Sequence, residues 1–320
     1  MTKRGRAASL LAAALLVSAC TSGGASPSAA SPSVAPASVA PASVAPASVA
    51  PTSVAPASVA PATPIAGGLL DVVMKAGQIR VSTDPQYPPQ SELKPDGSYE
   101  GFDIDVATEI AKRMGLGVKF ETPTWDTITA GSWSGRWDMS VGSMTITSPR
   151  QKVVDFSPAY YYTPAQMAAS TASGITTLDG LAGKTVCVGE ATTYLDWLNG
   201  TLDFGTESPQ TKPPAGATAT TLSTDRHCAE AWKAGRSEFQ GWLTSSTTVD
   251  QAVADGLPLV KVGDPVYSEP LAVAVDKSGP DPTDFMVKID ETVTAMHADG
   301  TLTRFSQKWF GADRTQKLGG

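Results

Sequence analysis

The sequence has little of what metal centres and nucleic-acid interfaces require. Its 320 residues include only two histidines and three cysteines, and these do not have the spacing of metal ligands. The formal net charge is −7, and no basic cluster follows the first six residues. Nucleic-acid binding needs a cationic surface, so the composition argues against it. We therefore expect a protein with no metal, no cofactor and no nucleic-acid partner.

The hydrophobic run near the N-terminus is short. Residues 10–17 follow three basic residues and are too few to span a bilayer as a permanent helix. The segment ends in Leu-Val-Ser-Ala-Cys, which is typical of a lipoprotein signal box. We predict that 1–19 is a lipoprotein signal peptide and that Cys20 carries a lipid; the alternative is an ordinary signal peptide that leaves Cys20 free. The predicted location is extracytoplasmic, lipid-anchored to the outer face of the cell membrane, with a mature charge of 21 − 31 = −10.

Residues 20–68 consist mainly of Ala, Pro, Ser and Val. The pentapeptide Ser-Val-Ala-Pro-Ala at 33–37 recurs every five residues through Ala62. Such a composition cannot bury a core, and frequent proline favours extended polyproline II, in which thirty residues reach roughly 90 Å. We predict a tether that holds a folded body away from the membrane; a glycosylated stalk is the alternative.

The cysteine count is consistent with export. If Cys20 carries a lipid, Cys187 and Cys228 remain as a pair, and such a pair in an exported protein is expected to form a disulfide. Closing a loop of about 40 residues would stabilise the fold by roughly 4 kcal/mol. The alternative is two buried thiols.

From residue 69 onwards, short apolar segments alternate with segments of helical periodicity. The expected strands are 79–82, 118–121, 139–142, 184–188, 237–244 and 272–275. The expected helices are 103–114, 127–135, 194–198, 226–235 and 247–255, followed by a long helix before Gly300 and a terminal helix, with a surface loop at 203–217. This alternation predicts an α/β fold with parallel strands, whose ligands bind beyond the carboxyl ends of the strands.

One segment, 140–150, combines groups that suit a carboxylate. Gly142 and Ser143 precede an alternating run that contains Thr145, and Arg150 follows five residues later. A guanidinium can bind both oxygens of a carboxylate while hydroxyl and amide donors take the remaining lone pairs. The alternative from these residues alone is a strand end with an exposed arginine.

Several further motifs occur in order across about 240 residues. They are Thr83-Asp84 with Tyr87-Pro88-Pro89, Gly101–Ala107, Met144–Thr147 with Arg150, Val154–Ser157 with Tyr160–Tyr162, Leu181–Lys184, Asp299–Leu302 and Lys308–Gly311. As an ordered set they resemble the family 3 extracellular solute-binding proteins, the polar amino-acid receptors of ABC importers.

The resemblance implies a type II periplasmic-binding-protein-like fold. Two α/β lobes joined by two crossover strands would close on a ligand. Lobe 1 would comprise 69–162 plus 272–320, and lobe 2 would comprise 163–267. The hinge would lie near 160–164 and 267–271.

The resemblance also implies roles for individual residues. Arg150 would bind a ligand carboxylate with help from Thr145, Ser143 and the Thr193 amide, while Tyr87 and Trp125 enclose the ligand and Asp84 meets a polar or cationic side chain. The aromatic residues could instead belong to the core, Asp84 could cap its own loop, and Thr193 could be a helix N-cap. The predicted ligand-binding residues are Asp84, Tyr87, Trp125, Ser143, Met144, Thr145, Arg150, Glu190, Thr192, Thr193 and Leu243.

Two positions depart from the family pattern. Leu243 stands where relatives usually have an acid that binds the ligand α-ammonium, and Gln90 replaces the phenylalanine that commonly follows Pro-Pro. Either another carboxylate such as Glu190 supplies the counter-charge, or the ligand lacks a standard α-amino group, because burying an unpaired ammonium costs several kcal/mol.

These observations predict a solute receptor rather than an enzyme. The protein would act as a monomer that passes a small carboxylate-containing ligand, an amino acid or derivative and possibly a cationic one, to an ABC permease and its ATPase. The first alternative is a dehydratase-like enzyme on the same scaffold, for which Asp84 and Glu190 are the only candidate acid and base. The second is a ligand sensor with a membrane partner.

Overall fold

The computed structural model describes residues 64–205, 209 and 211–317. The predicted signal peptide at 1–19, the lipidation site Cys20 and the predicted tether up to residue 63 lie outside this range. Among the described residues, no helix is both long enough and apolar enough to cross a membrane.

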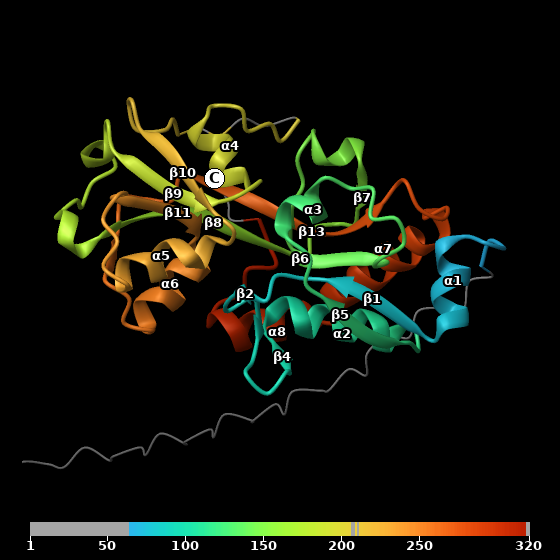
Figure 1. Cartoon of the computed structure of the whole chain (residues 1–320). Coiled ribbons are helices and arrows are strands. Elements are labelled where there is room, and N and C mark those ends of the chain that lie inside the picture. The colour runs from blue at the N-terminus through green and yellow to red at the C-terminus, as the bar shows by residue number, and fades with distance from the viewer. Residues whose placement is uncertain (1–63, 206–208, 210, 318–320) are drawn as a thin grey trace, which may run out of the picture. The chain divides into compact units, whose positions relative to one another are not determined.

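A mixed β-sheet connects the whole folded part (Figure 1). Its strands are, in spatial order, β10 (Thr218–Leu222), β9 (Thr185–Gly189), β11 (Gly241–Ser245), β8 (Tyr161–Ser170), β13 (Tyr267–Asp276), β6 (Met139–Thr145), β1 (Gln78–Ser82) and β5 (Gly117–Glu121). β12 (Leu259–Lys261) pairs with β8, β7 (Val154–Phe156) pairs with β13, and a small separate sheet contains β2 (Gln86–Tyr87), β3 (Ser91–Leu93) and β4 (Tyr99–Glu100).

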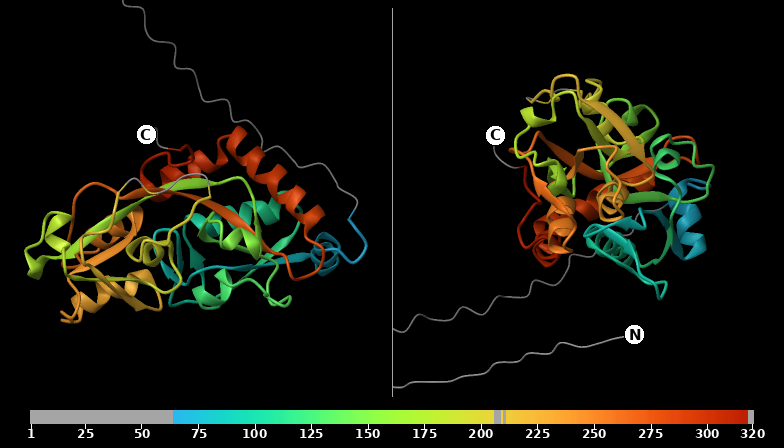
Figure 2. Two further views of the ribbon diagram at one scale, coloured as in Figure 1. Left: turned by 90° about the horizontal axis from the view of Figure 1, so that it is seen from above. Right: turned by 60° about the vertical axis from the view of Figure 1, so that its left-hand side comes forward.

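The two long strands β8 and β13 pass between the two halves of this sheet (Figure 2, left). Their first halves pair with each other in antiparallel register, from Tyr161 with Leu271 to Ala165 with Tyr267. Beyond this contact, β8 pairs with β11 and β12, whereas β13 pairs with β6 and β7. The fold class is therefore confirmed: an α/β protein with two crossover strands, in which the parallel pairs predicted from the sequence lie to either side.

Separate hydrophobic clusters cover both faces of each half of the sheet. In the half we call lobe 1, the helices are α1 (Leu69–Ala76), α2 (Phe102–Arg113), α3 (Trp125–Thr129), α7 (Thr283–Ala298) and α8 (Thr301–Phe310). In lobe 2 they are α4 (Thr193–Leu198), α5 (Asp225–Lys233) and α6 (Ser246–Ala254). Alternation along β11 places Leu243 in the cluster with α4 and Trp242 in the cluster with α5 and α6.

The prediction of a helix over 127–135 is wrong, because α3 ends at Thr129. Gly131, Ser132 and Ser134 all have positive φ angles, which a right-handed helix cannot accommodate. The carboxylate of Asp276 on β13 instead accepts hydrogen bonds from the amides of Ser132 and Trp133. Tertiary contacts with a distant strand thus replace the helical hydrogen bonds of this segment.

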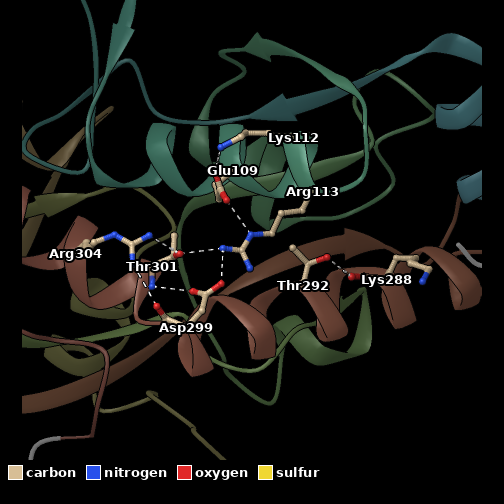
Figure 3. A network of polar contacts seen from close by, with 8 residues as sticks. All are labelled: Glu109, Lys112, Arg113, Lys288, Thr292, Asp299, Thr301 and Arg304. Carbon is tan, nitrogen blue, oxygen red and sulfur yellow. Dashed lines mark hydrogen bonds and ion pairs between the residues drawn. The ribbon is translucent and has the colours of Figure 1, made fainter. Parts of the chain in front are cut away.

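A buried polar network fixes the helices of lobe 1 to each other (Figure 3). Arg113 at the end of α2 donates to Glu109 at 2.9 Å and forms a 2.9 Å ion pair with Asp299, between α7 and α8. It also donates to the hydroxyl of Thr301, which in turn receives a hydrogen bond from Arg304. One side chain therefore joins three helices, and one of them, α2, packs against the strand β6 that reaches the cleft.

The predicted disulfide is confirmed. Cys187 on β9 and Cys228 on α5 are bonded, with their Cα atoms 5.8 Å apart. The bond closes a loop of 41 residues and fixes the first turns of α5 against β9.

Candidate ligand-binding site

A cleft lies between the lobes at the carboxyl ends of strands β1, β6 and β9. Together with the solvent at its mouth, the space measures about 450 Å³. The lining residues are Asp84, Tyr87, Trp125, Gly142, Ser143, Thr145 and Arg150 from lobe 1, and Gly189, Glu190, Thr192, Thr193, Tyr194, Ser223, Thr224 and Asp225 from lobe 2.

Arg150 is the one cationic side chain among these lining residues. It is 7% exposed, and its two terminal nitrogens donate to the carbonyls of Thr145 at 3.1 Å and of Ala191, across the cleft, at 2.9 Å. Burial lowers the pKa of Arg150, and the nearby Glu269 carboxylate opposes this effect. No carboxylate in the described part of the chain forms an ion pair with it. A buried guanidinium without a counter-ion favours binding of an external anion.

Aromatic rings enclose the guanidinium side of the cleft. The Trp125 ring centre lies 5.5 Å from the guanidinium carbon of Arg150, within cation–π range. Tyr87 is buried, and its hydroxyl lies 3.3 Å from that of Tyr194 in lobe 2. Both predicted aromatic residues therefore line the cleft, and their enclosure of a ligand stays a prediction.

Ser143 is held from within lobe 1. Its hydroxyl donates to Asp103 at 2.7 Å and lies 2.7 Å from the hydroxyl of Tyr161, while its N–H donates to Tyr160 at 3.0 Å. Burial raises the pKa of Asp103 to about 7. Because both donors of Ser143 are used inside the lobe, this arrangement leaves none for a ligand carboxylate.

Glu269 on β13 lies behind the cleft and is 1% exposed. One oxygen accepts hydrogen bonds from the hydroxyls of Thr145, at 2.8 Å, and Thr193; the other accepts from Tyr194 at 2.8 Å. Burial raises the pKa of Glu269. The two threonine hydroxyls are thus directed at Glu269. The donors that remain for a ligand anion are the free N–H groups of Arg150 and the N–H of Thr193, which as the first residue of α4 has no partner within the helix.

Two predicted carboxylates take different positions around the cleft. Asp84 is half-buried; it accepts the Gln86 N–H at 2.7 Å, and burial raises its pKa. Glu190 is exposed at the cleft rim. Within the described ranges, no group of His, Cys, Asp or Glu is arranged to hold a metal ion.

A third carboxylate, Asp225, is the first residue of α5 and is buried in the cleft wall. It accepts hydrogen bonds from the Gly189 N–H at 2.6 Å and from the Thr244 hydroxyl at 3.2 Å. Burial raises the pKa of Asp225 to about 8. With Asp84, Glu190 and Asp225 against Arg150, the lining carries more acidic than basic groups and favours a ligand with a cationic group.

Two predicted residues do not line the cleft. Met144 lies in the hydrophobic cluster of α3, and Leu243 lies in the cluster of α4. The reason is strand alternation: Ser143 and Thr145 face the cleft, so Met144 between them points to the opposite side. Thr192 lines the cleft but also caps α4, because its hydroxyl accepts the Leu195 N–H.

Sequence reasoning missed Tyr194 and Asp225 in the cleft lining and Glu269 behind it. Tyr194 follows the predicted Thr193 directly. Glu269 is a charged residue within the predicted hinge segment 267–271, which was a usable signal. Asp225 resembles any acidic residue in a first helical turn, so the sequence offered no signal for its role.

Gln90, which departs from the family pattern, bridges the lobes. Its side-chain amide donates to the hydroxyls of Ser245 at 3.1 Å and Thr247 at 2.7 Å, and its carbonyl accepts from Thr248 at 3.3 Å. Gln90 is fully buried and comes from lobe 1, whereas the three hydroxyls surround the start of α6 in lobe 2. Separation of the two halves would break these hydrogen bonds.

We expect Gln90→Leu to favour the open state. Each lost neutral hydrogen bond costs about 0.5–1.5 kcal/mol, so the loss of all three should weaken ligand affinity by roughly 10- to 2,000-fold. Small-angle scattering should report a larger radius of gyration for the ligand-free variant, and calorimetry the lower affinity. Gln86→Leu is the matched control, because Gln86 is exposed on the same loop. Unchanged affinity and radius for Gln90→Leu would contradict this role.

The sequence of this chain is similar to that of known binding proteins. The sequence model of the bacterial extracellular solute-binding proteins, family 3, matches residues 79–312. The L-cystine-binding protein TcyJ of Escherichia coli K12 is 29% identical over 259 residues, which cover 78% of this chain and 88% of TcyJ. The ABC transporter arginine-binding protein 1 of the same organism is 25% identical over 240 residues, 73% of this chain and 91% of that protein.

Solved structures with the same fold are also similar. One is an ABC uptake transporter substrate-binding protein from Streptococcus pneumoniae with bound histidine, with a TM-score of 0.66 and 25% identity over 79% of this chain and all of that one. Another is an ancestral amino acid-binding protein described as a precursor of cyclohexadienyl dehydratase, with a TM-score of 0.64 and 29% identity over 75% of this chain and 99% of that one.

Proposed function

The chain belongs to the bacterial extracellular solute-binding proteins, family 3, and we propose that its cleft captures an amino acid or amino-acid derivative for an ABC importer. The observation that carries this proposal is Arg150, a buried guanidinium in the cleft wall with no carboxylate partner among the described residues. A ligand carboxylate would supply the missing charge and accept the Thr193 N–H. The relatives named for binding cystine, arginine and histidine support the ligand class.

Capture would occur by closure of the lobes. A ligand that contacts both lobes binds the closed form more tightly than the open form and so shifts the equilibrium towards closure. The paired halves of β8 and β13 would form the hinge, since they are the strands that pass from one lobe to the other. Arg150 and Ala191 already contact each other across the cleft, so carboxylate binding and closure would be coupled.

The ligand would carry at least one cationic group. Asp84 and Asp225 contribute carboxylates from opposite lobes, and the Tyr87 and Trp125 rings offer faces that attract cations. Arginine, histidine and lysine therefore form the first group of candidates, with cystine as a zwitterion that has two ammonium groups.

The setting of the protein is part of the proposal. Cleavage before Cys20 and lipidation of this residue would anchor a monomer outside the cytoplasm, where the repeats in 20–68 let it reach a permease and its ATPase. The support is the Leu-Val-Ser-Ala-Cys box and the proline content of the repeats. We do not adopt the dehydratase alternative, because neither histidine of the chain lines the cleft, and His227, which interacts electrostatically with Asp84, forms no hydrogen bond with it among the described contacts.

A thermal-shift screen of the purified protein tests the function. The panel would hold all amino acids, cystine, polyamines, betaines and small organic acids. A ligand at about 100 times its Kd should stabilise the protein by roughly 2.7 kcal/mol, a rise in Tm of several degrees. A shift confined to amines without a carboxylate, or no shift at all, would contradict an amino-acid ligand bound through Arg150.

A further inference from the structure

Asp225 is as buried as a core residue, although its side chain is a carboxylic acid of the kind usually found at the surface. It is 7% exposed, and its two hydrogen bonds come from neutral donors, the Gly189 amide and the Thr244 hydroxyl. None of the ion pairs within the described part of the chain involves it. Burying a carboxylate without a cation is unfavourable, so a fold that keeps one in a cleft wall has a site that a cation can complete.

The wall around this carboxylate is shaped to keep it facing the cleft. A methyl group at Gly189 would lie 2.6 Å from the nearer oxygen of Asp225, so any larger residue would displace this carboxylate from its present position. Thr244, at the end of β11, holds the second oxygen. The disulfide at Cys228, one helical turn after Asp225, fixes α5 on β9.

The other possible counter-charges fit less well. Leu243 has no charge and faces the hydrophobic cluster of α4. Glu190 is exposed at the rim, where water screens its field. Glu269 is saturated by three hydroxyl donors and lies behind the lining.

We infer that Asp225 binds the α-ammonium of the ligand and thereby determines that this cleft prefers α-amino acids over their desamino counterparts. This inference rests on the proposed function and adds the residue that sets the specificity. Arg150 in lobe 1 and Asp225 in lobe 2 then hold the carboxylate and the ammonium of one ligand, so a zwitterion bridges the two lobes. Asp84 remains for the ligand side chain.

Proton release should accompany binding. Only the ionised form of Asp225 pairs with an ammonium, and burial raises its pKa to about 8, so below this pH the ligand must displace a proton. Affinity should therefore rise between pH 6 and 8 by up to tenfold per unit and level off above 8. Other groups interact electrostatically with Asp225 or with Asp84 beside it: Asp84, Tyr87, Tyr194, Tyr267, Glu269 and His227. The pH dependence of ligand affinity must therefore be measured in wild type and in Asp225→Asn. Only the part that disappears in the variant is attributed to Asp225.

The test is calorimetry on the purified full-length protein with matched pairs of ligands. The pairs are L-arginine with 5-guanidinopentanoate, L-histidine with 3-(imidazol-4-yl)propanoate, and L-cystine with 3,3′-dithiodipropionate. Wild type should bind at least one amino acid 100-fold or more tightly than its desamino partner. Asp225→Asn should reduce this ratio of affinities at least 30-fold, mainly by lowering the affinity for the amino acid. It should also abolish the proton release on binding.

Two further variants separate binding from structure. Gly189→Ala keeps the carboxylate but displaces it, so it should also lower the ratio, whereas Glu230→Gln, at an exposed position of α5 outside the cleft lining, should leave the ratio within threefold. The Asn oxygen can still accept the Gly189 N–H, and its NH2 group can donate to the Thr244 hydroxyl oxygen, so the Tm of ligand-free Asp225→Asn should not fall. An unchanged ratio in Asp225→Asn, or an equal loss of the ratio in Glu230→Gln, would overturn the inference while amino-acid binding by wild type still supported the proposed function. Wild type that bound none of the three amino acids would overturn both.

Discussion

Arg150→Ala should weaken binding of the ligand identified in the screen by about 30- to 5,000-fold. Removing one partner of a buried, hydrogen-bonded charge pair costs about 2–5 kcal/mol, in part because the other charge stays buried and unpaired. Arg150 is buried, lies against Trp125 and has free N–H donors directed into the cleft wall. Calorimetry of wild type and variant would measure the change.

A matched control exists within the same lobe. Arg136 also stacks on a tryptophan, with its guanidinium carbon 4.7 Å from the Trp137 ring centre, but it lies outside the cleft lining. Arg136→Ala should therefore bind ligand with wild-type affinity. Agmatine, which is arginine without its carboxylate, gives a second control. Because it has no carboxylate, its affinity should not depend on Arg150. Arg150→Ala should bind arginine and agmatine about equally; a variant that still preferred arginine would exclude Arg150 as the carboxylate site.

Replacing both Cys187 and Cys228 by alanine should cost about 4 kcal/mol of the free energy of unfolding. The loop that the bond closes spans 41 residues, and the chain-entropy model gives this value for such a loop. For a folded body of this size, Tm should fall by roughly 8–16 °C. Differential scanning calorimetry of the double variant, with and without reductant, would measure it.

A reducing agent distinguishes the effect of the disulfide bond on Tm from the effect of the side-chain contacts that the two alanine substitutions remove. Wild type in reductant should approach the Tm of the double variant, whereas the double variant should not respond. Because α5 carries Asp225 and β9 carries Gly189, the reduced protein should also bind the ligand more weakly below its Tm. A double variant with wild-type Tm would show that the packing of Trp232 and Trp242 around the bond is sufficient.

Much of the fold could be predicted because its signals are local. Alternating apolar segments and helix periodicity located most strands and helices, and the ordered motifs indicated the family. The predictions failed where distant contacts override local preference. The helix predicted over 127–135 ends at Thr129, and the carboxylate of Asp276, about 150 residues away in the chain, accepts hydrogen bonds from the amides of Ser132 and Trp133.

The residues of the candidate site also differ in whether local sequence signals reveal them. Arg150, Trp125 and Thr193 could be found because each belongs to a short motif that the resemblance recognises. Gln90 was visible as an unusual residue, but its partners at the start of α6 lie more than 150 residues further along the chain. Which face of β6 or β11 reaches the cleft depends on register, and that excludes Met144 and Leu243 from the lining.

By itself, the sequence determined the family and the α/β class with crossover strands, and it indicated Arg150 as the candidate residue for a ligand carboxylate. Only the tertiary structure decided where the opposing charges lie. Asp225 and Glu269 are more than 40 residues apart in the chain, and each becomes significant because packing removes it from water and surrounds it with particular donors. Desolvation and hydrogen-bond partners are properties of the folded surroundings, so a carboxylate in the cleft wall and one behind it look the same in the sequence.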